Sequence, residues 1–128
     1  ERVVVLDTTF LIALERREKA ADRLYASFVE AGQAIRIPAA VWVEYLSPMD
    51  AATQRKARVT LEDATIFEPF QRETADEAVD LQHELLGAGR RIGWHHLQVA
   101  ATARFHREAL ISNEAALQSL PGVETIPH

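Results

Sequence analysis

The chain opens with an apolar run that ends on a carboxylate, VVVLD at residues 3–7. Its β-branched residues do not alternate with polar ones, which is typical of a strand buried on both faces of a parallel sheet. Later strand-like segments lie at 34–39, 64–69, 109–112 and 123–126, and helical patterns separate them. The sequence therefore predicts an α/β fold with a central parallel sheet of about five strands, right-handed crossovers and helices on both faces.

The predicted helices have apolar residues at helical spacing. They cover residues 9–17, 20–31, 38–47, 50–62, 74–89 and 92–106, with a short helix at 114–120. Thr8 and Thr9 are N-cap candidates for the first of these helices. The small-residue run AATA at 100–103 allows a neighbouring element to approach the last long helix closely.

Composition limits the class of protein. At 128 residues, with 48% hydrophobic and 26% charged residues, we expect one globular domain spanning residues 1–128. The absence of cysteine excludes disulfides and thiolate metal sites. No apolar run is long enough to span a membrane and no signal-peptide pattern opens the chain, so we expect no membrane partner and a cytoplasmic location.

Acidic and polar residues follow two of the predicted strands. Asp7 ends the first strand, and Ser112, Asn113 and Glu114 follow the strand at 109–112. In parallel α/β sheets, ligands bind outside the carboxyl ends of the strands, where the strand order reverses. We therefore expect these residues to face one crevice.

Three segments in this order and spacing resemble a family. They are VVVLDTTFLI, PAAVWVEYL and LISNEAALQSLPGV, joined by GRRIGWHHLQVAATA. Together they resemble a PIN domain, and more closely the short VapC-type toxins, over nearly the whole chain. The resemblance implies a divalent-metal-dependent endoribonuclease, the toxin of a VapBC-type toxin–antitoxin pair. It also implies an RNA substrate, a cognate antitoxin whose tail covers the acidic crevice, and a homodimer.

The resemblance also implies roles for individual residues. Asp7, Glu44 and Glu114 would be metal-binding acids, and Thr8 would be the small polar residue beside the first of them. Because clustered carboxylates repel one another, a divalent cation is their natural partner, and oxygen ligands suit Mg²⁺ or Mn²⁺. The cation would activate a water and stabilise charge on the phosphodiester.

His96 stands where the family has an aspartate, and Ala116 occupies a position that is often acidic. Three interpretations follow. In the first, His96 ligates a metal, and the mixed N/O site suits Mn²⁺, Fe or Zn²⁺ better than Mg²⁺. In the second, it is a general acid or base, or a phosphate contact, beside a metal held by the three acids. In the third, the site has decayed, and the protein binds RNA or a partner without cleavage. The predicted catalytic and metal-binding set is therefore Asp7, Glu44, His96 and Glu114.

Structural roles compete for the same residues. Asp7 suits the N-terminus of a helix, Glu44 a salt bridge to an arginine in a buried setting, and Glu114 the start of a helix. His95 is expected to point to solvent, and Trp94 to pack or lie in a dimer interface. Arginine beside an aromatic ring is nevertheless typical of single-stranded RNA contacts. The predicted substrate-binding residues are Thr8, Arg90, Arg91, Trp94, His95, Ser112 and Asn113.

Two other function classes are disfavoured. The net charge of −5 argues against attraction of nucleic acid by the whole surface, although basic residues cluster locally, as at 16–19 and 55–58. A small-molecule α/β enzyme lacks support because the chain has neither a glycine-rich phosphate loop after the first strand nor a Gly-x-Ser-x-Gly motif.

Overall fold

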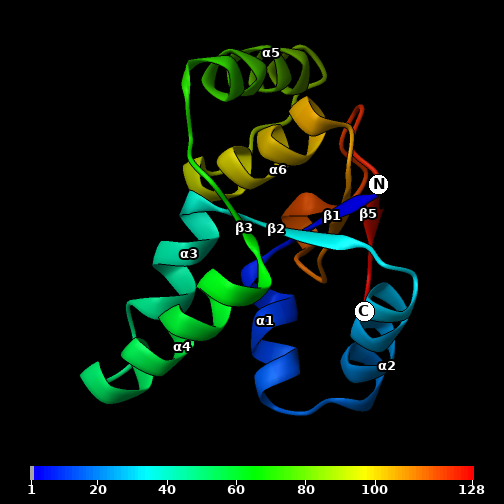
Figure 1. Cartoon of the computed structure of the whole chain (residues 1–128). Helices are drawn as coiled ribbons and strands as arrows, with labels where there is room; N and C mark the ends of the chain where they lie inside the picture. Colours follow the sequence, from blue (N-terminus) through cyan, green and yellow to red (C-terminus); the bar gives the residue numbers. More distant parts are fainter. Residues whose placement is uncertain (1) are drawn as a thin grey trace.

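The fold is described for residues 2–128 by a computed structural model (Figure 1). Its elements in chain order are β1 (Val3–Leu6), α1 (Thr8–Glu15), α2 (Lys19–Glu30), β2 (Ala34–Pro38), α3 (Ala39–Leu46), α4 (Ala51–Ala64), β3 (Ile66–Glu68), α5 (Arg72–Gly87), α6 (Trp94–His106), β4 (Ala109–Ile111), the 3₁₀ helix η1 (Ala115–Leu117) and β5 (Thr125–Ile126).

All five strands are parallel and lie in the order β3-β2-β1-β4-β5. β1 is therefore central, and its Val5 and Leu6 side chains are fully buried. The chain adds β2 and β3 on one side of β1 and then β4 and β5 on the other. The predicted five-stranded parallel sheet is confirmed, and its strand order reverses between β1 and β4.

Helices cover both faces of the sheet. Figure 1 shows α5 and α6 above the strands and α1, α2 and α4 below them; α6 contacts β2 and β4, and α5 packs on α6. α6 lies close to the sheet because the side chains on its inner face, Ala100, Ala101 and Ala103, are small, and all three are fully buried. In the part of the chain that the structure describes, none of the helices is long and apolar enough to cross a membrane.

Several element boundaries differ from the predictions. The N-cap of α1 is Asp7, so the predicted caps at Thr8 and Thr9 are wrong. α6 begins at Trp94, two residues late, because the Gln82 side chain bonds both the carbonyl and the N–H of Ile92 (3.0 and 3.4 Å). The helix predicted at 114–120 is only a 3₁₀ turn.

A buried ionic network links the sheet to the C-terminal end of α6. Arg36 on β2 donates to both oxygens of Glu108 (2.8 and 3.0 Å) and to Glu68 (2.7 Å), and these three side chains are 12–14% exposed. His106 Nε2 lies 2.9 Å from the second oxygen of Glu68. The carboxylates raise the pKa of Arg36 and so keep the guanidinium charged, which burial alone would oppose.

Candidate active site

An acidic pocket of about 300 Å³ lies where the strand order reverses, outside the carboxyl ends of β1 and β4. Its walls come from α1, α3, α6 and the turn after β4. It is lined by Asp7, Thr8, Thr9, Ile12, Glu44, Pro48, His95, His96, Val99, Glu114 and Leu117. All four residues of the predicted catalytic set therefore line one hollow.

Asp7 is 4% exposed and accepts hydrogen bonds at both carboxylate oxygens. Oδ1 accepts from the Phe10 backbone N–H (3.1 Å) and from the Thr9 hydroxyl (2.6 Å), and Oδ2 accepts from the Ser112 hydroxyl. The helix-capping role is thus present. It does not exclude a ligand, because two carboxylate oxygens offer about four acceptor positions and three are used.

The turn after β4 is held rigidly against Asp7. Ser112 is fully buried, and its hydroxyl oxygen accepts from the Glu114 backbone N–H at 2.9 Å. The Gln118 side chain donates to the carbonyls of Ser112 (3.0 Å) and Glu114 (3.1 Å). These bonds fix the backbone from which the Glu114 side chain, 37% exposed, reaches the pocket.

Two histidines in the first turn of α6 face the two other acids. His95 Nε2 lies 2.9 Å from Glu44 Oε1, and His96 Nε2 lies 3.8 Å from Glu114 Oε1. His95 therefore lines the pocket, and the prediction that it points to solvent is wrong. Glu44 is also half exposed and paired with a histidine, so the expected buried setting with an arginine partner is wrong.

The pocket's donor groups suit a divalent cation, although they are arranged in pairs. Among residues 2–128, no three His, Asp or Glu side chains converge closely enough to hold a metal ion. Three carboxylates, two imidazoles and two threonine hydroxyls nevertheless line one hollow, and one of these hydroxyls, Thr8 Oγ1, is buried without a hydrogen-bond partner among those residues. Since an unpartnered buried hydroxyl costs about 1–3 kcal/mol, the pocket fits a ligand that coordinates or bonds it.

A comparison with family models matches residues 4–123 to the PIN domain. The chain belongs to the PIN domain family. The resemblance seen in the sequence is therefore confirmed, and nuclease activity is the general function of PIN domains. A comparison with curated protein sequences gave no match.

Solved structures share the whole PIN fold with this chain. VapBC2 from Rickettsia felis bound to a promoter DNA fragment has a TM-score of 0.81 at 17% identity, with 98% of each chain covered. DNA-bound VapBC from Salmonella typhimurium has a TM-score of 0.79 at 14% identity, covering 99% of this chain and 98% of that one. VapBC-5 from Mycobacterium tuberculosis has a TM-score of 0.68 at 21% identity, with both chains fully covered.

The predicted substrate-binding residues divide into two groups in this PIN domain. Thr8 and His95 line the acidic pocket, and Ser112 and Asn113 belong to the turn beside it. Arg90, Arg91 and Trp94 do not line it. Arg90 donates to the Ser119 carbonyl (2.9 Å), whereas Arg91 and the 67% exposed Trp94 border a separate hollow between α5 and α6.

Sequence reasoning missed Thr9, which lines the pocket, and His128, which contacts Thr9 without lining it. The Thr9 hydroxyl donates to Asp7, and the His128 ring nitrogen Nε2 lies 3.2 Å from that hydroxyl. Thr9 follows Asp7 by two positions, which is a weak signal for a role beside it. No signal in the sequence points to His128, since β4–β5 pairing alone brings residue 128 to this edge of the sheet.

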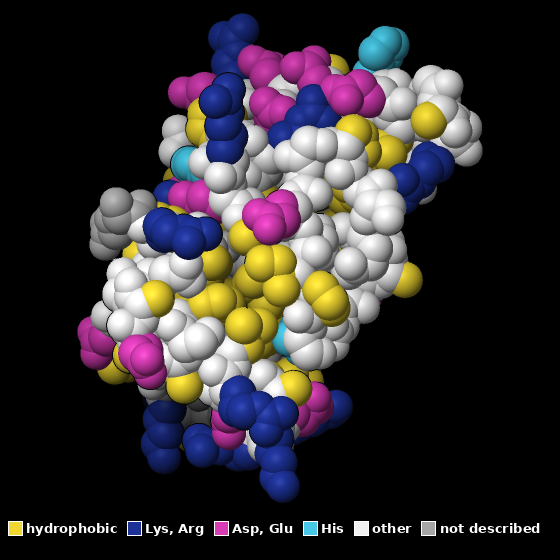
Figure 2. Space-filling view, turned by 90° about the vertical axis from the view of Figure 1, so that its right-hand side faces the viewer, with side chains coloured by type: hydrophobic (Ala, Val, Ile, Leu, Met, Phe, Trp, Pro, Cys, Tyr) yellow, Lys and Arg dark blue, Asp and Glu magenta, His cyan; other side chains and the backbone are white. Residues whose placement is uncertain are grey.

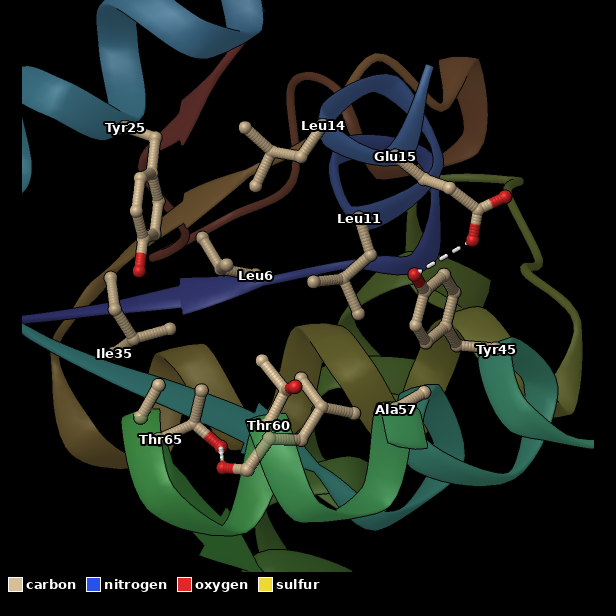
Figure 3. A pocket seen from close by; sticks show the side chains of 12 residues that line it. Leu6, Leu11, Leu14, Glu15, Tyr25, Ile35, Tyr45, Ala57, Thr60 and Thr65 are labelled. Atoms are coloured by element: carbon tan, nitrogen blue, oxygen red, sulfur yellow. Dashed lines mark hydrogen bonds between the residues drawn. The ribbon is translucent and has the colours of Figure 1, made fainter. Parts of the chain in front are cut away.

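An apolar hollow of about 320 Å³ lies on the other side of α1 (Figure 3). Leu11 and Leu14 of α1, Tyr25 of α2 and Ile35 of β2 form its walls, and α4 closes it from below in this view. At one end, the Tyr45 hydroxyl donates to Glu15 (3.0 Å). α1 thus separates an apolar hollow from the acidic pocket.

Proposed function

We propose that this PIN domain is the toxin of a VapBC-type pair, an endoribonuclease that cleaves RNA with a divalent cation. One observation carries the proposal. Three carboxylates from three separate chain segments, Asp7, Glu44 and Glu114, line one pocket at the switch point of a PIN fold. Assembling like charges in this way is costly without a cation, and a phosphodiester is a substrate that such a cation would serve.

Asp7, Glu44, Glu114 and His96 would hold the cation, Mg²⁺ or Mn²⁺. When bound, it would supply a positive charge that stabilises the negative charge developing on the phosphodiester oxygens. An imidazole among the ligands favours Mn²⁺. Glu44 and Glu114, which now contact His95 and His96, are the carboxylates that would have to turn toward it.

The chain's own groups would then orient RNA and move protons. Asp7 is held by three hydrogen-bond donors, so its carboxylate needs little reorganisation. His95 Nε2 lies 2.9 Å from Glu44 Oε1, so this carboxylate would orient the imidazole to accept or donate a proton in the reaction.

A local basic surface would contact the RNA backbone. Arg16, Arg17 and Lys19 are exposed at the end of α1 opposite Asp7, roughly 12 Å along an eight-residue helix. Figure 2 shows Lys and Arg side chains gathered at the lower end of one face, at the height of the loop between α1 and α2 in Figure 1. Such a cluster attracts phosphates despite the acidic total charge.

The proposed protein partner is an antitoxin. An apolar segment of it would fill the hollow lined by Leu11, Leu14, Tyr25 and Ile35, and a basic side chain of its tail would suit the acidic pocket across α1. The solved VapBC complexes, which share this fold, support such a partner. The homodimer implied by the resemblance is also part of the proposal, and light scattering of the purified chain tests it.

RNA cleavage tests the activity. Purified wild-type protein and Asp7→Asn are incubated with a mixed RNA pool, with Mn²⁺, with Mg²⁺ and with a chelator. We expect cleavage by the wild type only with a cation and none by Asp7→Asn. Metal-dependent cleavage that persists in a folded Asp7→Asn protein would contradict the proposal.

One observation favours a second candidate, a PIN-fold module that binds RNA or a partner without cleavage. In the described residues Glu44 and Glu114 each lie beside a histidine, and no three acids or histidines converge closely enough to hold a metal ion. His96→Asp separates the two. A gain of Mg²⁺-dependent cleavage indicates a decayed nuclease, whereas a loss of activity indicates that the histidine serves the reaction.

A further inference from the structure

His128 lies behind the acidic pocket, on the far side of Thr9 from it. Residue 126 pairs with residue 111 in the β4–β5 ladder, and the Ser112 N–H donates to the Ile126 carbonyl (3.0 Å). This pairing delivers residue 128 to the turn that begins at Ser112. His128 is not among the residues that line the pocket, so any effect on the site must pass through another side chain.

Asn113 fixes the backbone of His128 by two hydrogen bonds. The His128 N–H donates to Asn113 Oδ1 and Asn113 Nδ2 donates to the His128 carbonyl, both at 2.7 Å. The His128 ring also packs edge-on against Phe10 with ring centroids 4.9 Å apart. The imidazole is therefore held in position by three contacts that do not involve the pocket.

The hydrogen bonds assign the proton on the His128 ring. Thr9 has one hydroxyl proton and gives it to Asp7 Oδ1 (2.6 Å), so the Thr9 oxygen accepts from its other neighbours, the Asn113 N–H (3.2 Å) and His128 Nε2 (3.2 Å). His128 Nε2 must then be the protonated nitrogen. Nδ1, without a proton, faces Asn113 Nδ2 at 3.3 Å.

A neutral ring agrees with the surroundings of His128. Burial lowers the pKa of His128, although the negative charges of Asp7 and Glu18 act in the opposite direction. A neutral imidazole with its proton on Nε2 satisfies both ring contacts at once. The chain of donors therefore runs from His128 to Thr9 and from Thr9 to Asp7.

We propose that His128 is a positioning residue, which holds the Thr9 hydroxyl in the one rotamer that donates to Asp7 and so orients this carboxylate for the cation. This inference rests on the proposed function. With two donors filling its lone pairs, the Thr9 oxygen can direct its proton only toward Asp7. Thr9 is the outer partner bonded directly to Asp7, and partners of that kind typically contribute about 10–100-fold to metal affinity or activity.

Three variants separate hydrogen bonding from packing. His128→Phe keeps a ring against Phe10 but removes the donor. His128→Gln places an amide N–H near the position of Nε2, whereas the shorter His128→Asn does not reach it. His83→Phe, at an exposed position on α5 away from the pocket, is the control for a histidine-to-phenylalanine change.

The first readout is the Thr9 rotamer in metal-free protein, measured from three-bond couplings to its γ-methyl group. We expect a single χ1 rotamer in the wild type and His128→Gln, and averaged rotamers in His128→Phe and His128→Asn. A single unchanged rotamer in His128→Phe would overturn the inference, whether or not the protein proves to be a nuclease.

The second readout is Mn²⁺ affinity by calorimetry. We expect His128→Phe to bind at least about tenfold more weakly than the wild type and His128→Gln to retain most of the affinity. Equal affinities for these two variants would leave only a packing role and contradict the inference. If the wild type binds no Mn²⁺, the proposed function fails, and the rotamer measurement alone decides the role of His128.

Discussion

Asp7→Ala should cost far more stability than Asp7→Asn. Alanine removes the N-cap of α1, a loss of about 1 kcal/mol, and leaves the O–H of the fully buried Ser112 without its acceptor, a further cost of roughly 1–3 kcal/mol. The sum is roughly 2–4 kcal/mol. Asparagine keeps the cap through its amide oxygen, and its Nδ2, which stands in place of Oδ2, can donate to the Ser112 oxygen. It loses the charge and one acceptor but leaves Ser112 a partner, so we expect a smaller loss of about 1 kcal/mol.

Urea unfolding followed by tryptophan fluorescence measures these differences. With an m-value of about 1–3 kcal/mol per molar, Asp7→Ala should lower the midpoint by roughly 1–2 M. Asp50→Ala is the matched control, because Asp50 caps α4 through the same contact, to Thr53 N–H at 2.9 Å, but is exposed. Its loss of stability should be the smaller one.

Equal stabilities of Asp7→Ala and Asp7→Asn would refute this reasoning. So would a gain of stability in both variants, because the cost of burying the Asp7 charge would then exceed the value of its three hydrogen bonds. Either result would mean that the donors around Asp7 do not hold it as described.

Three further outcomes follow from the structure. Arg36→Met removes both hydrogen bonds that Arg36 gives to the largely buried Glu108 and leaves Glu68 with His106 alone, so it should lower the free energy of unfolding by about 3–5 kcal/mol, measured in urea; no change would contradict the ionic network. Burial and the bond to Glu15 raise the pKa of Tyr45 to about 12, above the ordinary value near 10, so its contribution to stability should decline as pH rises from about 10 to 12. Ultraviolet titration should show a tyrosine ionising near pH 12 that Tyr45→Phe removes. Leu85→Ala, at 2% exposure, should cost about 2–5 kcal/mol, whereas Leu86→Ala, at 51%, should cost far less; equal losses would contradict the packing of α5.

The fold followed from local patterns. Apolar runs without alternation, such as VVVL, occur where a strand is covered on both faces. Because helical segments separate these runs, the strands are expected to pair in parallel through helical crossovers. The prediction erred at helix ends. At Ile92 and Arg72 the boundary depends on side-chain bonds, from Gln82 and within a Gln71–Thr74 capping box, that periodicity does not contain.

The sequence predicted which acidic residues line the pocket, but it did not predict which side chains these acids contact. Asp7 and Glu114 follow strands whose ends a parallel sheet brings together, so their proximity was deducible. Glu44 lies inside α3, and only the resemblance to the PIN domain assigned it to the site. The partnership of His95 with Glu44 was not, because a helix places successive residues about 100° apart and sequence alone does not give the rotation of α6. His128 was undetectable, since a long-range strand pairing brings it to Thr9.

The central claim is that the acidic pocket binds a divalent cation. The most direct measurement is calorimetric titration of Mn²⁺ and of Mg²⁺ into the wild type and into Asp7→Asn, with folding of both checked by urea unfolding. The account predicts binding by the wild type, tighter for Mn²⁺ because of His96, and no binding by Asp7→Asn. Equal binding by the two proteins, or none by the wild type, would contradict it.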